Sequence, residues 1–128
     1  MKTILIVDDE INIRKIYAYF LVMNGYRVIE ASNVKGAKEI LKTKDIHVAL
    51  LDIRLPKIDS SILLYQTIKL FHRNVKVIVA SVYGVDRQKE IIVGAHDYYD
   101  KTKGLNVLLR KVNAVAESES MVENCCAI

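Results

Sequence analysis

Apolar and polar positions along the chain follow two alternating patterns. Short runs rich in β-branched apolar residues, such as TILIV at 3–7, are typical of strands buried in a parallel sheet. On this basis we predict strands at residues 3–7, 26–30, 47–51, 75–80 and 97–100. Each strand is followed by a stretch whose apolar residues recur at the spacing of one helix face. The pattern therefore predicts five consecutive strand–helix units.

The five helical stretches differ in how clearly their buried faces stand out. The apolar residues expected to be buried are Ile13, Ile16, Tyr17, Phe20 and Leu21 in the first, Val34, Ala37 and Leu41 in the second, Leu64, Ile68 and Phe71 in the third, and Leu105, Leu108, Leu109, Val112 and Val115 in the last. Residues 85–93 indicate a short fourth helix with a weaker pattern. Gly25 is expected to end the first helix. The side chains of Asp59, Ser60 and Ser61 are expected to cap the third.

Alternating strands and helices predict an α/β fold built on a parallel sheet. Right-handed crossovers between parallel strands place helices on both faces of such a sheet. We expect one doubly wound domain over residues 1–117, because 128 residues suit a single core. Residues 118–128 are predicted to form an acidic, frayed C-terminal tail. Ligands of these sheets bind beyond the carboxyl ends of the strands, which is where we look for a site.

Charge is unevenly distributed along the chain. The net charge is +4, but every basic residue lies at or before Lys111, so residues 1–116 carry +7 and residues 117–128 carry −3. A basic body suits nucleic acid or an acidic partner. No basic run stands beside interleaved aromatic residues, however, so we expect no direct binding of nucleic acid.

Targeting signals are weak or missing in the sequence. The longest unbroken apolar runs have four residues, which is far short of a membrane span, and the opening MKTILIVDDE lacks the long apolar region of a signal peptide. Cys125 and Cys126 are adjacent and cannot form a disulfide framework. The final CCAI formally matches a prenylation box, which we interpret as a chance match in a frayed tail. We expect a cytoplasmic protein without membrane association.

Polar residues come directly after four of the predicted strands. They are Asp8, Asp9 and Glu10 after the first strand, Asp52 after the third, Ser81 after the fourth, and Lys101, with Asp100 before it, after the fifth. If these strands are neighbours, the side chains converge on one rim of the sheet. Three carboxylates at close range repel one another, and a divalent cation such as Mg²⁺ or a nearby ammonium relieves that repulsion.

This set of groups suits a phosphoryl group. A metal ion and Lys101 would neutralise the phosphoryl oxygens, and Ser81 would donate a hydrogen bond to one of them. A carboxylate can itself be the nucleophile and form an aspartyl phosphate. Each residue alone has an ordinary explanation as a helix cap, a turn residue or a solvated charge. Their joint occurrence at matching strand ends favours the functional interpretation.

Four segments carry a resemblance to a known family. They are IVDDE at 6–10, LLDIRLPKID at 50–59, VIVAS at 77–81 and HDYYDKT at 96–102. With the 44-residue gap from Asp8 to Asp52, they resemble the receiver domain of two-component response regulators, over residues 3 to about 116. The resemblance implies a flavodoxin-like fold, with a five-stranded parallel sheet in the order 2-1-3-4-5 and five flanking helices.

The resemblance also implies a function and the residues that perform it. Asp52 would accept a phosphoryl group from a histidine kinase or phosphotransfer protein, in a Mg²⁺-dependent reaction, and Ser81 and Lys101 would contact that group. The switch would pass through Ser81 and Tyr98 to an output domain or downstream protein. The chain would then be a phosphoacceptor switch with slow self-dephosphorylation rather than an enzyme, and homodimers are one expected form.

The metal site is implied by the resemblance in the same way. Asp9, Asp52 and the backbone carbonyl of Arg54 would bind Mg²⁺ directly, and Asp8 would act mostly through water. The sequence departs from the family pattern at Thr102, where a proline is usual, and at Ser60, where a glycine is usual.

Two further departures bear on how the site would work. Val82 stands where a small residue is usual, and we expect it to hinder water at the site together with Arg54. The interval from Ser81 to Lys101 is 20 residues, about two short of the family norm, which shortens the region of the fourth helix.

Two rival functions are open at this point. A degenerate receiver would keep the fold and bind a protein partner without phosphorylation. The missing proline and short fourth helix favour it slightly, whereas the intact set of Asp8, Asp9, Asp52 and Lys101 disfavours it. A metal-dependent phosphatase of the haloacid dehalogenase type would use an aspartyl nucleophile. That type needs a second acid two residues after the nucleophile, and Arg54 occupies this place.

Overall fold

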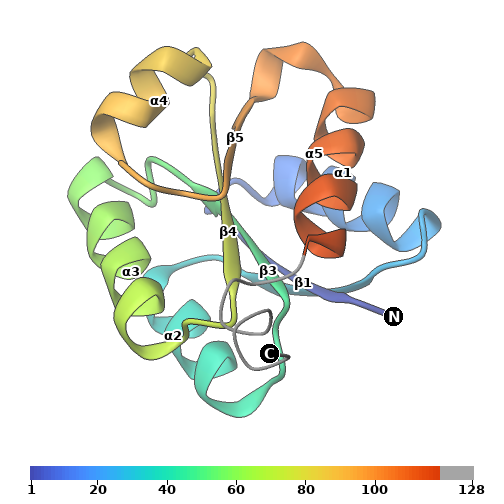
Figure 1. Cartoon of the computed structure of the whole chain (residues 1–128), viewed down its shortest axis with the longest axis horizontal. Coiled ribbons are helices and arrows are strands. Elements are labelled where there is room, and N and C mark those ends of the chain that lie inside the picture. Colours follow the sequence, from blue (N-terminus) through green and yellow to red (C-terminus); the bar gives the residue numbers. More distant parts are fainter. Residues whose placement is uncertain (119–128) are drawn as a thin grey trace, which may run out of the picture.

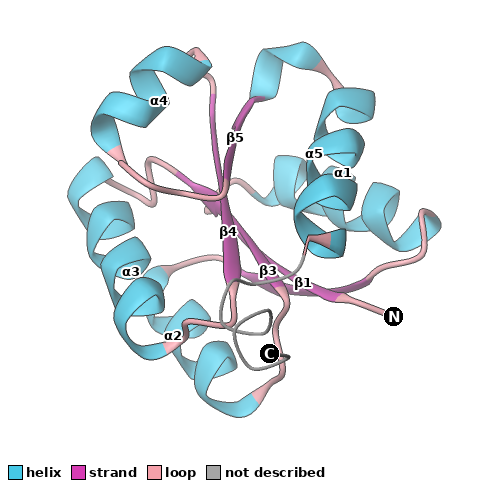
Figure 2. Cartoon of the chain, in the orientation of Figure 1, coloured by secondary structure: helices cyan, strands magenta, loops and turns pink. Residues whose placement is uncertain are grey.

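The computed structural model describes residues 1–118 and has the alternating order of strands and helices that the sequence predicts (Figure 1, Figure 2). The strands are β1 (Thr3–Val7), β2 (Arg27–Ala31), β3 (Val48–Asp52), β4 (Lys76–Ser81) and β5 (Asp97–Asp100). The helices are α1 (Ile11–Met23), α2 (Val34–Thr43), α3 (Ile58–Phe71), α4 (Val85–Ile91) and α5 (Leu105–Glu117), with a 3₁₀ turn, η1 (Lys101–Lys103), before the last.

All five strands pair in parallel, in the order β2-β1-β3-β4-β5. The register brings the strand ends level: Val7 pairs with Ala31 on one side and with Leu51 on the other. The α/β class, the parallel sheet and its strand order are therefore confirmed. Because β1 and β3 are neighbours, the residues that follow them are placed next to each other.

The sheet separates two apolar layers. Successive residues of a strand point to opposite faces, so Ile4 and Ile6 pack with α1 and α5, whereas Leu5 and Val7 pack with α2 and α3. Figure 1 shows α5 and α1 on one side of the sheet and α2, α3 and α4 on the other. With both faces covered, only the ends and edges of the sheet are left for binding.

Three strands lie one residue further along the chain than the hydrophobic pattern suggests. β2, β3 and β4 begin at Arg27, Val48 and Lys76, and the last two run on into Asp52 and Ser81. Sheet pairing is made by the backbone, so these polar residues still pair, Asp52 with Ala80 and Ser81 with Asp100. Asp52 and Ser81 are thus the last residues of their strands, whereas Asp8, Asp9 and Lys101 follow theirs as predicted.

Two expected core residues are instead exposed. Ile16 is 50% exposed because α1 packs against the sheet through Tyr17, Ala18 and Leu21. Phe71 is 76% exposed because it is the last residue of α3 and the chain turns at His72. Periodicity alone does not show where a helix ends or which of two adjacent apolar residues faces the sheet.

The expected capping of α3 is also wrong. Its N-cap residue is Lys57, without a side-chain cap, and Asp59, Ser60 and Ser61 already lie within the helix. None of the helices within residues 1–118 has the length and apolar character that a membrane span requires. The predicted tail beyond Ser118, with Cys125 and Cys126, lies outside the described residues.

Candidate functional site

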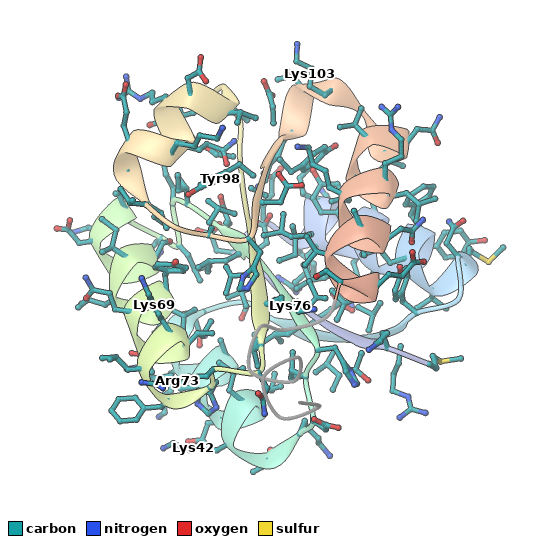
Figure 3. The ribbon with its side chains drawn as sticks, in the orientation of Figure 1. Lys42, Lys69, Arg73, Lys76, Tyr98 and Lys103 are labelled. Atoms are coloured by element: carbon teal, nitrogen blue, oxygen red, sulfur yellow. The ribbon has the colours of Figure 1, made fainter. Side chains whose placement is uncertain are left out.

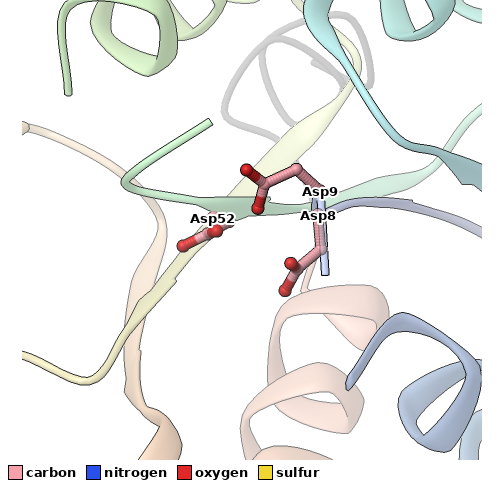
Figure 4. Close-up of side chains that lie close together, drawn as sticks. All are labelled: Asp8, Asp9 and Asp52. Atoms are coloured by element: carbon pink, nitrogen blue, oxygen red, sulfur yellow. The ribbon is translucent and has the colours of Figure 1, made fainter. Parts of the chain in front are cut away.

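Three carboxylates meet at the carboxyl end of the sheet. One oxygen from each of Asp8, Asp9 and Asp52 lies within 4.8 Å of the other two (Figure 4). Asp8 and Asp9 follow β1, and Asp52 ends the neighbouring β3. Asp8 is only 3% exposed and Asp52 only 9%, whereas Asp9 is exposed. The convergence that the sequence predicts is present.

Lys101 supplies the cation at this cluster. Its ammonium donates to Asp8 Oδ2 at 2.8 Å and lies 3.4 Å from Asp52 Oδ1. Lys101 begins η1, directly after β5, and the adjacent Asp100 accepts hydrogen bonds from the backbone and hydroxyl of Thr102 at 2.9 and 2.6 Å. The Lys101–Thr102 peptide bond is trans, since the cis bond among the described residues joins Leu55 and Pro56.

The environment of Asp52 raises the pKa of its carboxyl group. Burial raises the pKa of the Asp52 carboxyl above its ordinary value, and the charge of Asp8 raises it further. Lys101 and a hydrogen bond from the Arg54 N–H, at 3.4 Å, act in the opposite direction but do not offset the burial. Without a further cation, this carboxylate is therefore an unfavourable charge in the folded chain.

This imbalance predicts how stability depends on pH in metal-free buffer. The folded state holds the Asp52 proton more tightly than the unfolded state, so stability falls as pH rises from the ordinary carboxyl pKa through the raised one. In EDTA at pH 7, Asp52→Asn should therefore melt at a higher temperature than wild type. The difference should vanish near pH 3.5, where both side chains are neutral. The control is Asp45→Asn at an exposed position, and equal melting of wild type and Asp52→Asn at pH 7 would contradict the argument.

Ser81 and Tyr98 lie where the sequence places them, both buried. Ser81 ends β4 and is 2% exposed, and its Oγ accepts a hydrogen bond from the Tyr83 N–H at 3.2 Å. Tyr98 is 6% exposed, and its hydroxyl donates to Ile92 O at 2.6 Å and accepts from the Ala95 N–H at 3.1 Å. In this structure the Tyr98 ring is therefore turned inward, beneath the segment that follows α4 (Figure 3).

An open cavity of about 400 Å³ lies over the cluster. Asp9, Asp52, Ser81 and Lys101 line it, and so do Arg54 and Val82 at its edge. Val82 is 55% exposed and does not point into the core. The Arg54 guanidinium lies 5.6 Å from the centroid of the Tyr83 ring, a distance at which a cation–π contact is favourable.

Three residues to which the sequence suggested no role at the rim also support the site. The Ser61 hydroxyl is fully buried, donates to Asp52 O at 2.7 Å and accepts from the Leu55 N–H at 3.1 Å, which ties the loop after β3 to α3. Arg14 donates to Asp8 O at 2.9 Å and pairs with Glu30 at 3.0 Å.

The third of these residues is Gln88 on α4. It is fully buried and donates to Tyr83 O and Tyr99 O at 2.8 and 2.9 Å, which joins α4 to the loop after β4 and to β5. A polar residue inside an otherwise weak helical pattern is the one signal of this role in the sequence.

The donor set at the rim fits a hard divalent cation. Such ions take oxygen ligands, and carboxylates are their usual protein ligands. The three carboxylates carry more negative charge than Lys101 alone balances. Asp9, the exposed member, faces the cavity through which an ion would enter.

Comparison with known proteins identifies the class to which this fold and site belong. The family model described as the response regulator receiver domain matches residues 4–113. The phosphate regulon transcriptional regulatory protein PhoB of Pseudomonas aeruginosa is 34% identical, over 95% of this chain and 57% of that protein. The probable transcriptional regulator ycf27 of Cyanidium caldarium is 35% identical, over 77% of this chain and 39% of that protein. The chain belongs to the response regulator receiver family.

Solved structures agree with this assignment. The response regulator TrrA of Thermotoga maritima, determined in complex with Mg²⁺ and a beryllium fluoride, is 30% identical, with a TM-score of 0.80 over 90% of this chain and 99% of that one. A second response regulator of Thermotoga maritima is 27% identical, with a TM-score of 0.83 over 92% of this chain and 99% of that one. The chain spans between 39% and 57% of the length of the curated relatives it matches.

Proposed function

We propose that Asp52 is the phosphoacceptor of a Mg²⁺-dependent switch and that residues 1–117 form the receiver domain. The observation that carries the proposal is the joint position of Asp52, Asp8, Asp9 and Lys101 at one end of the sheet, beneath an open cavity. Receiver domains are phosphoacceptor switches, and the match to that family supports the same role here.

In the proposed reaction an Asp52 carboxylate oxygen attacks the phosphorus of the donor. A new bond forms between this oxygen and phosphorus, and the bond from phosphorus to the donor's leaving atom breaks. The leaving group keeps the electron pair of that bond. When the donor is a phosphohistidine, the leaving atom is an imidazole nitrogen. Lys101, which already lies between Asp8 and Asp52, is near enough to balance the charge on the transferred oxygens.

Asp9, Asp52 and the Arg54 carbonyl would hold Mg²⁺, with Asp8 acting mostly through water. When bound, the ion supplies positive charge against the phosphoryl oxygens. Asp8 also has a structural task, because its Oδ1 accepts from the Glu10 N–H at 2.9 Å and its Oδ2 accepts from Lys101. Ser81 would bond to the phosphoryl group, and Ser81 and Tyr98 would carry the change toward α4 and β5.

Magnesium should stabilise the folded chain. A ligand that binds only the folded state adds RT ln(1 + [L]/Kd), or about 1.4 kcal/mol at tenfold saturation. The melting temperature should rise at millimolar Mg²⁺, and Asp9→Ala should remove most of the rise. Asp45→Ala, which removes an exposed acid elsewhere, should leave it unchanged. If the melting temperature of the wild type does not change with Mg²⁺, the result favours the degenerate receiver.

The functional class is tested with a small phosphodonor. Wild-type chain is incubated with acetyl phosphate and Mg²⁺, and intact mass and free phosphate are followed together. A phosphoacceptor gains one phosphoryl increment per chain and releases phosphate slowly, and the increment disappears in EDTA. Continuous rapid turnover would indicate a phosphatase, and neither gain nor turnover would indicate a degenerate receiver.

The partners follow from the same proposal. A histidine kinase or phosphotransfer protein would supply the phosphoryl group, in the cytoplasm. An output domain or downstream protein would receive the signal, and the chain would form a homodimer if its output requires one. The matched relatives are named as transcriptional regulators, which supports an output in gene expression.

A further inference from the structure

A second hollow lies at the opposite end of the sheet from the acid cluster. It has a volume of about 380 Å³ and runs between the last turns of α3 and the start of β4, below the segment that joins α4 to β5. Its floor is apolar and is formed by Tyr65, Ile68, Val75 and Val77. Leu70, at its edge, is 63% exposed. We call this hollow the α3–β4 groove.

The rim of the α3–β4 groove is positively charged. Lys69 lies in the last turn of α3, and Arg73 follows the end of the helix four residues later. Both are exposed (Figure 3). Neither takes part in an ion pair with another residue within 1–118. None of the residues within 1–118 that line the groove is acidic. His96, on the other side, accepts a hydrogen bond at Nδ1 from the Val77 N–H at 3.1 Å and so contributes no free acceptor there.

The described chain ends beside this groove. The ammonium of Lys76 donates to the carbonyl of Ser118 and, at 2.9 Å, to its hydroxyl. Lys76 stands between Val75 and Val77 in sequence, and its side chain points to the opposite face of the sheet, toward the end of α5. Ser118 has the extended backbone of a chain leaving its helix. Ser118 is thus held at the start of β4, on the face opposite Val75 and Val77, which line the groove.

The sequence after Ser118 is complementary to the groove. Met121 and Val122 form an apolar pair, and Glu119 and Glu123 flank it. Residues 119–128 contain no basic residue. Ten residues reach about 33 Å when extended, which is enough to cross one sheet edge. A segment tethered at this distance also has an effective concentration in the millimolar range.

We propose that residues 119–128 dock in the α3–β4 groove of their own chain. Met121 and Val122 cover the apolar floor, and Glu119 and Glu123 pair with Lys69 and Arg73. The segment then shields an apolar hollow at the end of the sheet remote from Asp52. This inference is independent of phosphorylation and stands or falls separately from it.

The two native cysteines make the test direct. In the full chain, Cys126→Ser leaves Cys125 as the single thiol. A nitroxide is attached to Cys125. Amide signals are then recorded by NMR before and after the nitroxide is reduced. We expect broadening of amides in residues 69–75 and 94–96, at least threefold stronger than at Val22 and Met23 on α1. The double variant Lys69→Glu, Arg73→Glu should lose this broadening. The matched double variant Lys35→Glu, Lys38→Glu, on the exposed face of α2, should keep it.

Three results would overturn the proposal. Broadening could centre on Lys2, Asp45 and His47, which line a neighbouring polar hollow next to Ser118. It could persist in the Lys69→Glu, Arg73→Glu variant although that variant keeps a folded spectrum. It could also appear only when chain that carries the nitroxide is mixed with isotope-enriched chain that carries none. That result would identify a second copy as the occupant.

Discussion

Replacing Asp52 by asparagine is expected to abolish phosphorylation by acetyl phosphate with Mg²⁺. The amide has almost the same size as the carboxyl group but no anionic oxygen to attack phosphorus. Lys101 keeps its 2.8 Å contact with Asp8, so the geometry of the rim should persist. Intact mass should show no phosphoryl increment, whereas wild type gains one per chain.

The matched control is Asp59→Asn, because Asp59 belongs to the same sequence segment but is exposed in the first turn of α3. This variant should be phosphorylated like wild type. Labelling of Asp52→Asn at the wild-type level would assign the phosphoacceptor to another residue, and Asp8 or Asp9 would then be examined by the same substitution. A folded amide spectrum of Asp52→Asn separates loss of chemistry from loss of structure.

The parallel sheet could be predicted from the sequence for physical reasons, whereas its strand order was implied by the family resemblance, and the meeting of the acids depends on that order. Five apolar runs separated by helical stretches allow few arrangements other than a doubly wound sheet. In a parallel sheet all carboxyl ends lie at one edge. Once β1 and β3 are neighbours, Asp8 and Asp52 must therefore be close, and the structure places Lys101 between them.

The supporting contacts could not be predicted in the same way. Ser61 has the composition of a helix cap, yet its hydroxyl bridges Asp52 O and the Leu55 N–H inside the fold. Arg14 lies on a helix with no local pattern that distinguishes it from a solvated basic residue, but it holds the backbone after β1. Such roles depend on which loops meet in space, and hydrophobic periodicity carries no information about that.

The lifetime of the phosphorylated chain is expected to depend on Arg54 and Val82. Hydrolysis requires a water molecule in line with the phosphorus–oxygen bond of the aspartyl phosphate. Both residues line the cavity over Asp52, so both stand where such a water would enter. Val82 is β-branched and stiff about χ1, which limits its ability to turn aside. Arg54 is exposed, and its guanidinium lies 5.6 Å from the centroid of the Tyr83 ring, a cation–π contact that favours its position at the cavity.

We therefore expect Arg54→Ala and Val82→Ala each to shorten the half-life of the phosphorylated chain, and the double variant to shorten it about tenfold, which corresponds to a barrier lower by about 1.4 kcal/mol. The chain is phosphorylated with acetyl phosphate, the donor is removed, and loss of the mass increment is followed with time. Arg87→Ala is the control for charge, because Arg87 stacks on the same Tyr83 ring at 4.7 Å but does not line the cavity. It should leave the half-life unchanged.

If the double variant decays at the wild-type rate, Arg54 and Val82 do not shield the phosphoryl group. If Arg87→Ala accelerates decay as strongly as Arg54→Ala, the effect comes from general charge rather than from a barrier to water.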